Sequence, residues 1–420
     1  MRSAIAASWA LFFGIALLML GNGLQGSLLG VRATLEGFST GVTGVVMSGY
    51  FVGFLAASTL APRILARVGH IRVFAALASL ASTAALLHAV FVDPTTWFAM
   101  RLVTGFCVAG LYVVAESWIN DRATNETRGQ LLSVYMVIVM GGMGGGQLLL
   151  NLAAPAGYDL FILVSVLVSI ALVPILLTVA PAPSFDAPAR VGLRQLYAIS
   201  PLGVLGVMGT GLSNGALVGM GAVYAGLAGL SLAEVSLFMA AAFAGAVALQ
   251  WPIGRLSDRF DRRRVLTMVT FLAALAALAA AAIPGLAGPT LLALAALFGG
   301  LSFPMYALCI AHTNDYLEPE QMVGASAGLV LAAGVGAMLG PFTAAQAMAL
   351  FGPAGFFWFL AAAHAAIGVF AVWRMTEREA CPLDEQGPCV MMTRTTPYAA
   401  GLAVEEAYEQ GEETAGEAQA

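Results

Sequence analysis

Charged side chains, and lysine above all, are what this sequence has least of. Only 10% of its 420 residues are charged, 60% are hydrophobic, and the mean hydropathy is +0.88. A soluble globular domain is usually about 45–50% apolar and about 25% charged, so this composition excludes a soluble globule and predicts a polytopic membrane protein. All 18 basic residues are arginine, which excludes the lysine-containing phosphate loop of nucleotide hydrolases.

Cysteine is scarce as well. The four cysteines are widely spaced, two in apolar runs and two near the C-terminus: Cys107, Cys309, Cys381 and Cys389. This spacing predicts neither a disulfide framework nor a zinc site, and we expect no cofactor, no metal and no nucleic-acid partner. The segment from Cys381 to Cys389 leaves metal binding or redox sensing open, although an ordinary reduced tail is the favoured interpretation.

Apolar runs fill most of the chain. Twelve of them reach the ~20 residues that cross a bilayer core, at about 4–31, 42–62, 73–92, 96–118, 130–152, 158–180, 201–225, 232–254, 265–283, 289–311, 325–350 and 354–373. They predict an all-α membrane protein with two six-helix bundles, 1–180 and 201–374, a cytoplasmic connector at 181–200, and a disordered acidic tail at 375–420.

One half of the chain repeats the other. An offset of 192 residues pairs Asn22 with Asn214 and Arg67 with Arg259, and further pairs follow with small insertions. Because Asn22 in the first apolar run has this repeat partner deep in the chain, we expect the first run to be a retained helix and not a cleaved signal peptide. Parallel repeats of six spans place a substrate site near the membrane midplane between the halves.

The stretch from Gly254 to Arg264 carries the most specific motif. It combines a glycine expected to end a helix, Asp258, Arg259, Asp261 as a turn residue that tolerates the left-handed conformation, and four further arginines. In type and order this resembles the signature loop of the major facilitator superfamily of secondary transporters. The segments 116–120, 123–129 and 251–262 most resemble its YcaD-type bacterial branch.

The resemblance implies a fold and a mechanism. It implies twelve helices in two pseudo-symmetric bundles that rock about a central cavity lined by spans 1, 4, 7 and 10. The cargo would be a small organic solute, anionic or amphipathic, with efflux somewhat favoured and proton coupling left open. A membrane receptor of the same fold that signals through its acidic tail is the alternative. We expect a monomer in contact with lipid and a small-molecule substrate, and no enzyme; the hydrolase-like Gly211–Gly215 pattern has no strand before it.

Polar residues inside the spans are the candidates for substrate binding, since each is costly in hydrocarbon. Arg101, Tyr112 and Glu116 lie within about 60° on one helix face. The resemblance makes Arg101 a substrate or coupling residue, with Gly105 opening room beside it; snorkelling to the interface is the alternative. Further candidates for the cavity wall are Asn22, Gln25, Asn214, Gln147 and Tyr306. Hydrogen bonding between helices competes with ligand binding for these amides.

Arginines also set the orientation. They gather in the loops after spans 2, 4, 6 and 8, which by the positive-inside rule places both termini in the cytoplasm of a bacterial inner-membrane protein. The resemblance implies a charge network that latches this cytoplasmic gate, made by Arg67, Glu116, Arg128, Gly254, Asp258 and Arg259. In the first repeat Ala66 replaces the expected aspartate, which predicts a weaker contact there.

Overall fold

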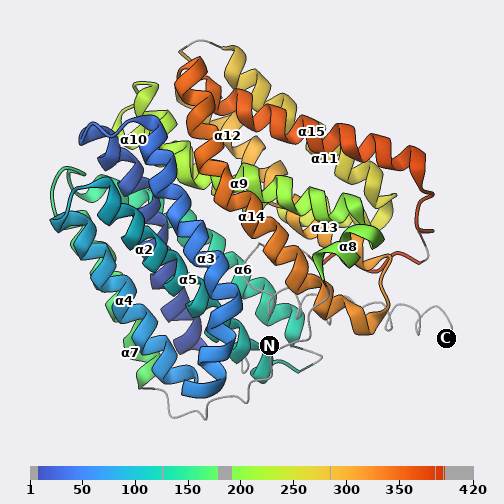
Figure 1. The fold of residues 1–420 in the computed structure, drawn as a ribbon, viewed down its shortest axis with the longest axis horizontal. Coiled ribbons are helices and arrows are strands. Elements are labelled where there is room, and N and C mark those ends of the chain that lie inside the picture. The colour runs from blue at the N-terminus through green and yellow to red at the C-terminus, as the bar shows by residue number, and fades with distance from the viewer. Residues whose placement is uncertain are drawn as a thin grey trace.

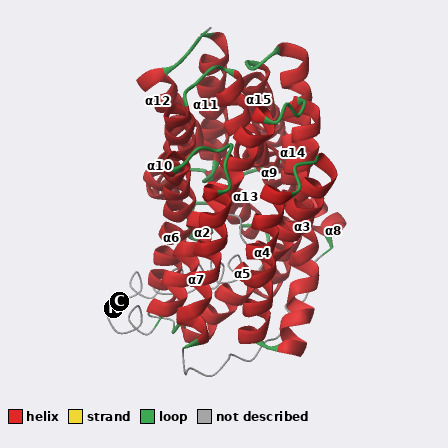
Figure 2. Cartoon of the chain, turned by 90° about the vertical axis from the view of Figure 1, so that its left-hand side faces the viewer, coloured by secondary structure: helices red, strands yellow, loops and turns green. Residues whose placement is uncertain are grey.

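The computed structural model describes residues 8–124, 127–177, 192–283, 285–383, 385–390 and 392, without the side chains of residues 122, 319, 320 and 323. Within these residues the chain is helical and contains no strand (Figure 2). In this described part of the chain, twelve helical segments are long and apolar enough to cross a membrane. The predicted fold class is therefore confirmed.

The first half contains six spans, whose ends differ by a few residues from the predicted apolar runs; α3 and α5 extend beyond theirs because polar residues continue these helices past the hydrocarbon. The spans are α2 (Trp9–Leu35), α3 (Thr40–Val68), α4 (His70–Val90), α5 (Pro94–Arg122), α6 (Arg128–Leu148, prolonged by the 3-10 turn η1, Leu149–Leu152) and α7 (Asp159–Leu176). Helix boundaries are set by capping residues such as Ser39, whose side chain accepts a hydrogen bond from the Val42 N–H at the start of α3.

The second half starts with a short helix that lies in the predicted connector, α8 (Leu193–Ile199), while residues 181–191 lie outside the described part. The spans that follow are α9 (Pro201–Leu227), α10 (Leu232–Arg259), α11 (Arg262–Ala282), α12 (Gly288–Ser302) with α13 (Met305–Asn314), α14 (Pro319–Phe351) and α15 (Gly355–Glu377). The tenth span is thus two helices, because Pro304 has no N–H to continue the ladder.

The two halves lie side by side and meet along three helix pairs, α2 with α9, α3 with α14, and α6 with α10 (Figure 1). Glycine permits the close approach at the second pair: a side chain on Gly44 of α3 would strike Ala345 and the Pro341 carbonyl of α14. At the third pair the Asn151 amide donates to Ser236 Oγ at 2.8 Å.

These contacts lie toward one end of the bundle. We call the end that carries the loops after α3 and α10 the arginine-rich end. Gly44, Ala345, Asn151 and Ser236 all lie near the opposite helix ends, so the halves close on each other at the end away from the arginines.

The signature segment differs from its expected conformation. Helix α10 runs through Gly254 and ends at Arg259, so Gly254 is buried inside a helix and does not end it. Asp261 has φ −50°, not a left-handed value. It caps α11 by accepting the Arg263 N–H at 2.9 Å, and this hydrogen bond explains why an aspartate stands there.

The C-terminal segment folds back over the arginine-rich end of the second half. We call residues 378–392, apart from 384 and 391, the C-terminal strap. Cys389 and Met392 are buried, and the Arg262 guanidinium donates to the Gly387 carbonyl. The sequence predicted disorder from residue 375; α15 instead continues to Glu377 and the strap packs on the bundle, because buried arginines supply donors for its carbonyls. Residues 393–420 lie outside the described part.

Candidate functional site

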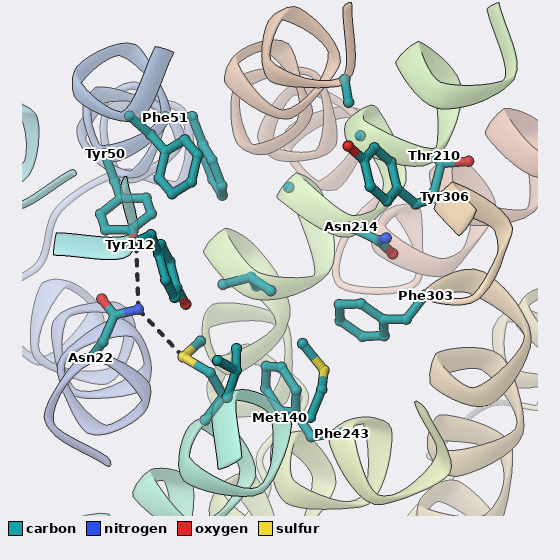
Figure 3. A pocket seen from close by; sticks show the side chains of 17 residues that line it. Asn22, Tyr50, Phe51, Tyr112, Met140, Thr210, Asn214, Phe243, Phe303 and Tyr306 are labelled. Atoms are coloured by element: carbon teal, nitrogen blue, oxygen red, sulfur yellow. Dashed lines mark hydrogen bonds between the residues drawn. The ribbon is translucent and has the colours of Figure 1, made fainter. Parts of the chain in front are cut away.

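A cavity of about 100 Å³ lies between the two halves near the middle of the spans. Side chains from both halves face each other across it (Figure 3). Its wall is mostly aromatic and aliphatic with a few amides and hydroxyls: Asn22, Tyr50, Phe51, Phe54, Tyr112, Val139, Met140, Met143, Thr210, Gly211, Asn214, Gly215, Val218, Phe243, Phe303, Tyr306 and Ala333. An apolar enclosure with a few convergent polar groups is the usual form of a small-molecule site.

The wall from the first half is organised around Asn22 of α2. Its amide nitrogen lies 3.3 Å from the Tyr50 hydroxyl and 3.3 Å from the Met143 sulfur. The Tyr112 hydroxyl, from α5, donates a hydrogen bond to the Met19 sulfur at 2.8 Å. Asn22 is therefore oriented by neighbours on α3 and α6.

The wall from the second half is organised around Asn214, the repeat partner of Asn22. Its side-chain oxygen accepts a hydrogen bond from Ser302 Oγ at 2.8 Å, and Ser302 lies 3.0 Å from His364 Nε2. Since Ser302 gives its proton to Asn214, it accepts from His364, which places the imidazole proton on Nε2. This buried chain fixes the orientation of Asn214 from behind.

Ser213 also lies 3.1 Å from His364 Nε2. The pair has the residue types of a nucleophile and its base, but among the described residues His364 Nδ1 has no hydrogen-bond partner to orient the ring. Both side chains are fully buried behind the cavity wall. The contact is thus structural support for Asn214.

The break in the tenth span brings aromatic side chains to the cavity. Phe303 and Tyr306 flank Pro304 at the junction of α12 and α13, and both line the wall. Irregular backbone at membrane depth occurs where it borders a cavity or is buried in protein. The Phe303-Pro304 pair is the sequence signal for this break, which the prediction of one continuous span at 289–311 overlooked.

Two predicted wall residues lie elsewhere. Gln147 is buried between α2 and α6, where it accepts from Ser27 and donates to the Gly23 carbonyl at 3.1 Å. It joins two helices, as the competing interpretation proposed. Gln25 is 4% exposed, and its amide nitrogen has no acceptor among the described residues.

Arg101 lies outside the cavity wall. Its guanidinium is buried, 4.5 Å from the centre of the Tyr50 ring, so that Tyr50 stands between Arg101 and Asn22. Its Nε and Nη1 have no hydrogen-bond acceptor among the described residues. Gly105 does not open room beside the guanidinium: a side chain there would strike the Tyr50 backbone, so this glycine serves the close packing of α3 and α5.

The predicted gate residues lie in separate groups at the arginine-rich end. In the first half Glu116 is fully buried and accepts a hydrogen bond from the Tyr135 hydroxyl at 2.8 Å, while Arg128 starts α6 and Arg67 is exposed in the last turn of α3. In the second half Asp258 accepts the Cys389 N–H at 2.7 Å and lies 3.9 Å from Arg262, while Arg259 is exposed.

Two six-helix halves around a central cavity define the class of this protein as a membrane transporter. The sequence model of the Major Facilitator Superfamily matches residues 11–227 and again 203–388, and the chain belongs to that family.

Among curated proteins it is similar to the uncharacterized MFS-type transporter YcaD of Escherichia coli O7:K1, with 30% identity over 338 residues, which is 80% of this chain and 87% of the relative. The same protein from Escherichia coli O45:K1 is 29% identical over the same shares.

Solved transporters share the fold at low identity. The nucleoside transporter NupG is 14% identical with a TM-score of 0.70, covering 90% of this chain and 100% of that one. A bacterial homolog of the human lysosomal transporter Spinster, in an inward-facing and occupied conformation, is 17% identical with a TM-score of 0.70, and the match covers 92% of this chain and 99% of that one. The human organic anion transporter MFSD10 is 16% identical with a TM-score of 0.62, and the match covers 88% of this chain and 100% of that one.

Proposed function

We propose that this protein is a secondary transporter that carries a small, largely apolar organic solute through the cavity between its halves. The observation that carries the proposal is the cavity itself, where two amides related by the internal repeat, Asn22 and Asn214, face each other between aromatic and methionine side chains. Methionine side chains adapt to varied apolar shapes, and paired amides accept and donate hydrogen bonds.

The wall favours a neutral or weakly polar substrate in the described conformation. Its seventeen residues include no charged side chain, and burial of an ion without a partner is costly. An anionic substrate requires Tyr50 to swing aside, because its ring covers the Arg101 guanidinium. Arg101 therefore remains a coupling candidate that a conformational change would expose.

The halves contact each other at the end away from the arginines, and this one-sided closure supports a mechanism of alternating access. With the arginine-rich end in the cytoplasm, the described state faces inward, and efflux would start with loading from that side. In the outward-facing state the halves would meet at the arginine-rich end. Asp258 and Arg259 would then meet Glu116, Arg128 and Arg67 across the interface as the latch. Glu116, fully buried, is our candidate for the proton-carrying carboxyl.

The test is a thermal-shift screen of the purified protein against three sets of probes: neutral nucleosides, amphipathic drugs and small organic anions. Ligands that bind the native state raise the melting temperature. We expect neutral amphipathic probes to stabilise the wild type and to lose that effect in Asn22→Ala and Asn214→Ala.

The control Asn120→Ala removes an exposed amide outside the cavity and should keep the response. If only anions stabilise the protein, and Arg101→Ala alone abolishes their effect, the neutral-solute proposal fails and Arg101 becomes the binding residue. The receptor alternative would show ligand binding without flux into proteoliposomes; membership of a transporter family argues against it.

A further inference from the structure

A second, smaller pocket lies at the arginine-rich end of the second half, away from the transport cavity. It is lined by Ser200, Pro201, Leu202, Arg263, His312, Tyr316, Arg374 and Arg378. Three of these eight residues are arginines and none is a carboxylate. We infer that this pocket binds the phosphate group of an anionic phospholipid or of a soluble phosphate.

The guanidinium groups are held in place by the protein. Arg378 donates to the Ile199 carbonyl at 2.8 Å and stacks on the Tyr316 ring at 3.8 Å. Arg263 donates to the Arg378 carbonyl at 2.7 Å and pairs with Asp261. Arg374 and Arg378 have no carboxylate partner among the described residues, so two of the three positive charges remain uncompensated there.

The start of helix α9 forms another side of the pocket. Gly203 and Val204 donate their N–H groups to Ser200, whereas the N–H of Leu202 has no acceptor in the described part of the chain. The positive end of a 27-residue helix favours an anion at this position.

His312 supplies the independent sign of a ligand. Its side chain is only 5% exposed, it lines the pocket, and no hydrogen bond to it occurs among the described residues. Its ring packs edge-on against Tyr316 with the centroids 5.2 Å apart. A buried imidazole without a protein partner is expected to bind something else, and a phosphate oxygen accepts its N–H.

Size and position narrow the ligand class. The volume of the pocket is about 20 Å³, which is the space that one or two water molecules occupy. It therefore admits phosphate oxygens but not a sugar or a base. It lies where α9 begins and α15 ends, at the boundary between span and loop, and basic pockets at this depth bind lipid headgroups.

The experiment uses the purified full-length protein and three probes: phosphatidylglycerol, phosphatidylcholine and inorganic phosphate. Native mass spectrometry counts retained lipid, and melting temperature reports stabilisation. We expect phosphatidylglycerol to bind and Arg378→Gln to weaken it about tenfold, since charge-assisted hydrogen bonds are the strong ones. Arg264→Gln removes a nearby charge that is 77% exposed and outside the pocket, and should change little.

Because Arg378 also donates to the Ile199 carbonyl, Arg374→Gln is the second variant. The Arg374 side chain has no hydrogen bond to the backbone among the described residues, and its guanidinium lies 5.5 Å from the centre of the Trp373 ring. Stabilisation by inorganic phosphate but not by phosphatidylglycerol, lost in both variants, identifies a soluble phosphate as the ligand and keeps the site. Equal binding of phosphatidylglycerol by wild type, Arg374→Gln and Arg378→Gln, with no response to phosphate, overturns the inference.

Discussion

Arg262 and Asp315 form an ion pair of 2.5 Å beneath the C-terminal strap, with side chains only 1% and 2% exposed. Arg262 also donates to Ser257 and to the Gly387 carbonyl of the strap. The pair thus joins α11, the loop after α13 and the strap. A buried ion pair is costly to break because the remaining charge loses its partner.

The first prediction concerns pH. Burial raises the pKa of Asp315 to about 6, even though the Arg262 guanidinium acts to lower it. Between pH 4 and 6 the folded protein holds this proton and the unfolded chain does not, so the contribution of Asp315 to stability rises as pH falls through 6. From pH 7.5 to 5 the gain is about 1 kcal/mol, or roughly 2 °C in melting temperature.

The control for this prediction is Asp315→Asn, which cannot titrate. The difference in melting temperature between pH 5 and pH 7.5 should be more favourable in the wild type than in the variant. An equal difference in both proteins would show that Asp315 is already ionised near its ordinary pKa.

The second prediction concerns the strap thiols. Burial raises the pKa of Cys389 to about 11, and its N–H is held by Asp258 at 2.7 Å. Cys389 should therefore react with maleimide at pH 7.5 far more slowly than the half-buried Cys381. Mass spectrometry of Cys381→Ala and Cys389→Ala proteins separates the two rates.

Asp258→Ala should speed the labelling of Cys389 by releasing the strap, whereas Glu379→Ala, an exposed carboxylate on the strap, should not. Rapid labelling of Cys389 in the wild type would contradict a strap that packs on the bundle.

The third prediction concerns the support of Asn214. Ser302→Ala removes the hydroxyl that joins Asn214 to His364, and should cost roughly 1 kcal/mol, as polar contacts between membrane helices do. Ser326→Ala is matched, because Ser326 is equally buried but, among the described residues, its hydroxyl bonds only to the Met322 carbonyl of its own helix. Equal melting temperatures of the two variants would argue against the chain behind the cavity.

The sequence predicted the fold well because a membrane restricts it. The helices are predicted by twelve apolar runs of sufficient length. Their grouping is predicted by the repeat offset and by the concentration of arginines in the loops on one side of the membrane. The strap was not predictable in this way: its composition is that of a disordered tail, and its packing depends on hydrogen bonds from Arg262 and Arg263, which lie more than 100 residues away in the chain.

The site was predictable only in part. The repeat singled out Asn22 and Asn214, and both line the cavity. Phe51, Met140 and Phe243 could not be distinguished from other apolar residues, since hydrophobic periodicity and composition do not indicate which face of a helix borders the cavity. Arg101 was predicted to face the cavity, but the Tyr50 ring covers it; this ring comes from α3, a contact that sequence spacing does not contain.

The central claim is that the halves rock about the cavity. Gly44→Trp should wedge apart the closed end, where α3 meets Ala345 of α14, and so close the arginine-rich end. Gly141→Trp, on an exposed face with nothing near its Cβ position, is the matched control.

The measurement is double electron–electron resonance on a background without the four cysteines. One spin-label pair, at Ile64 and Phe260, spans the arginine-rich end, and the other, at Leu35 and Leu227, spans the opposite end; all four side chains are exposed. We predict that Gly44→Trp shortens the first distance and lengthens the second, while Gly141→Trp changes neither. Two distances that stay fixed, or that rise together, would contradict alternating access.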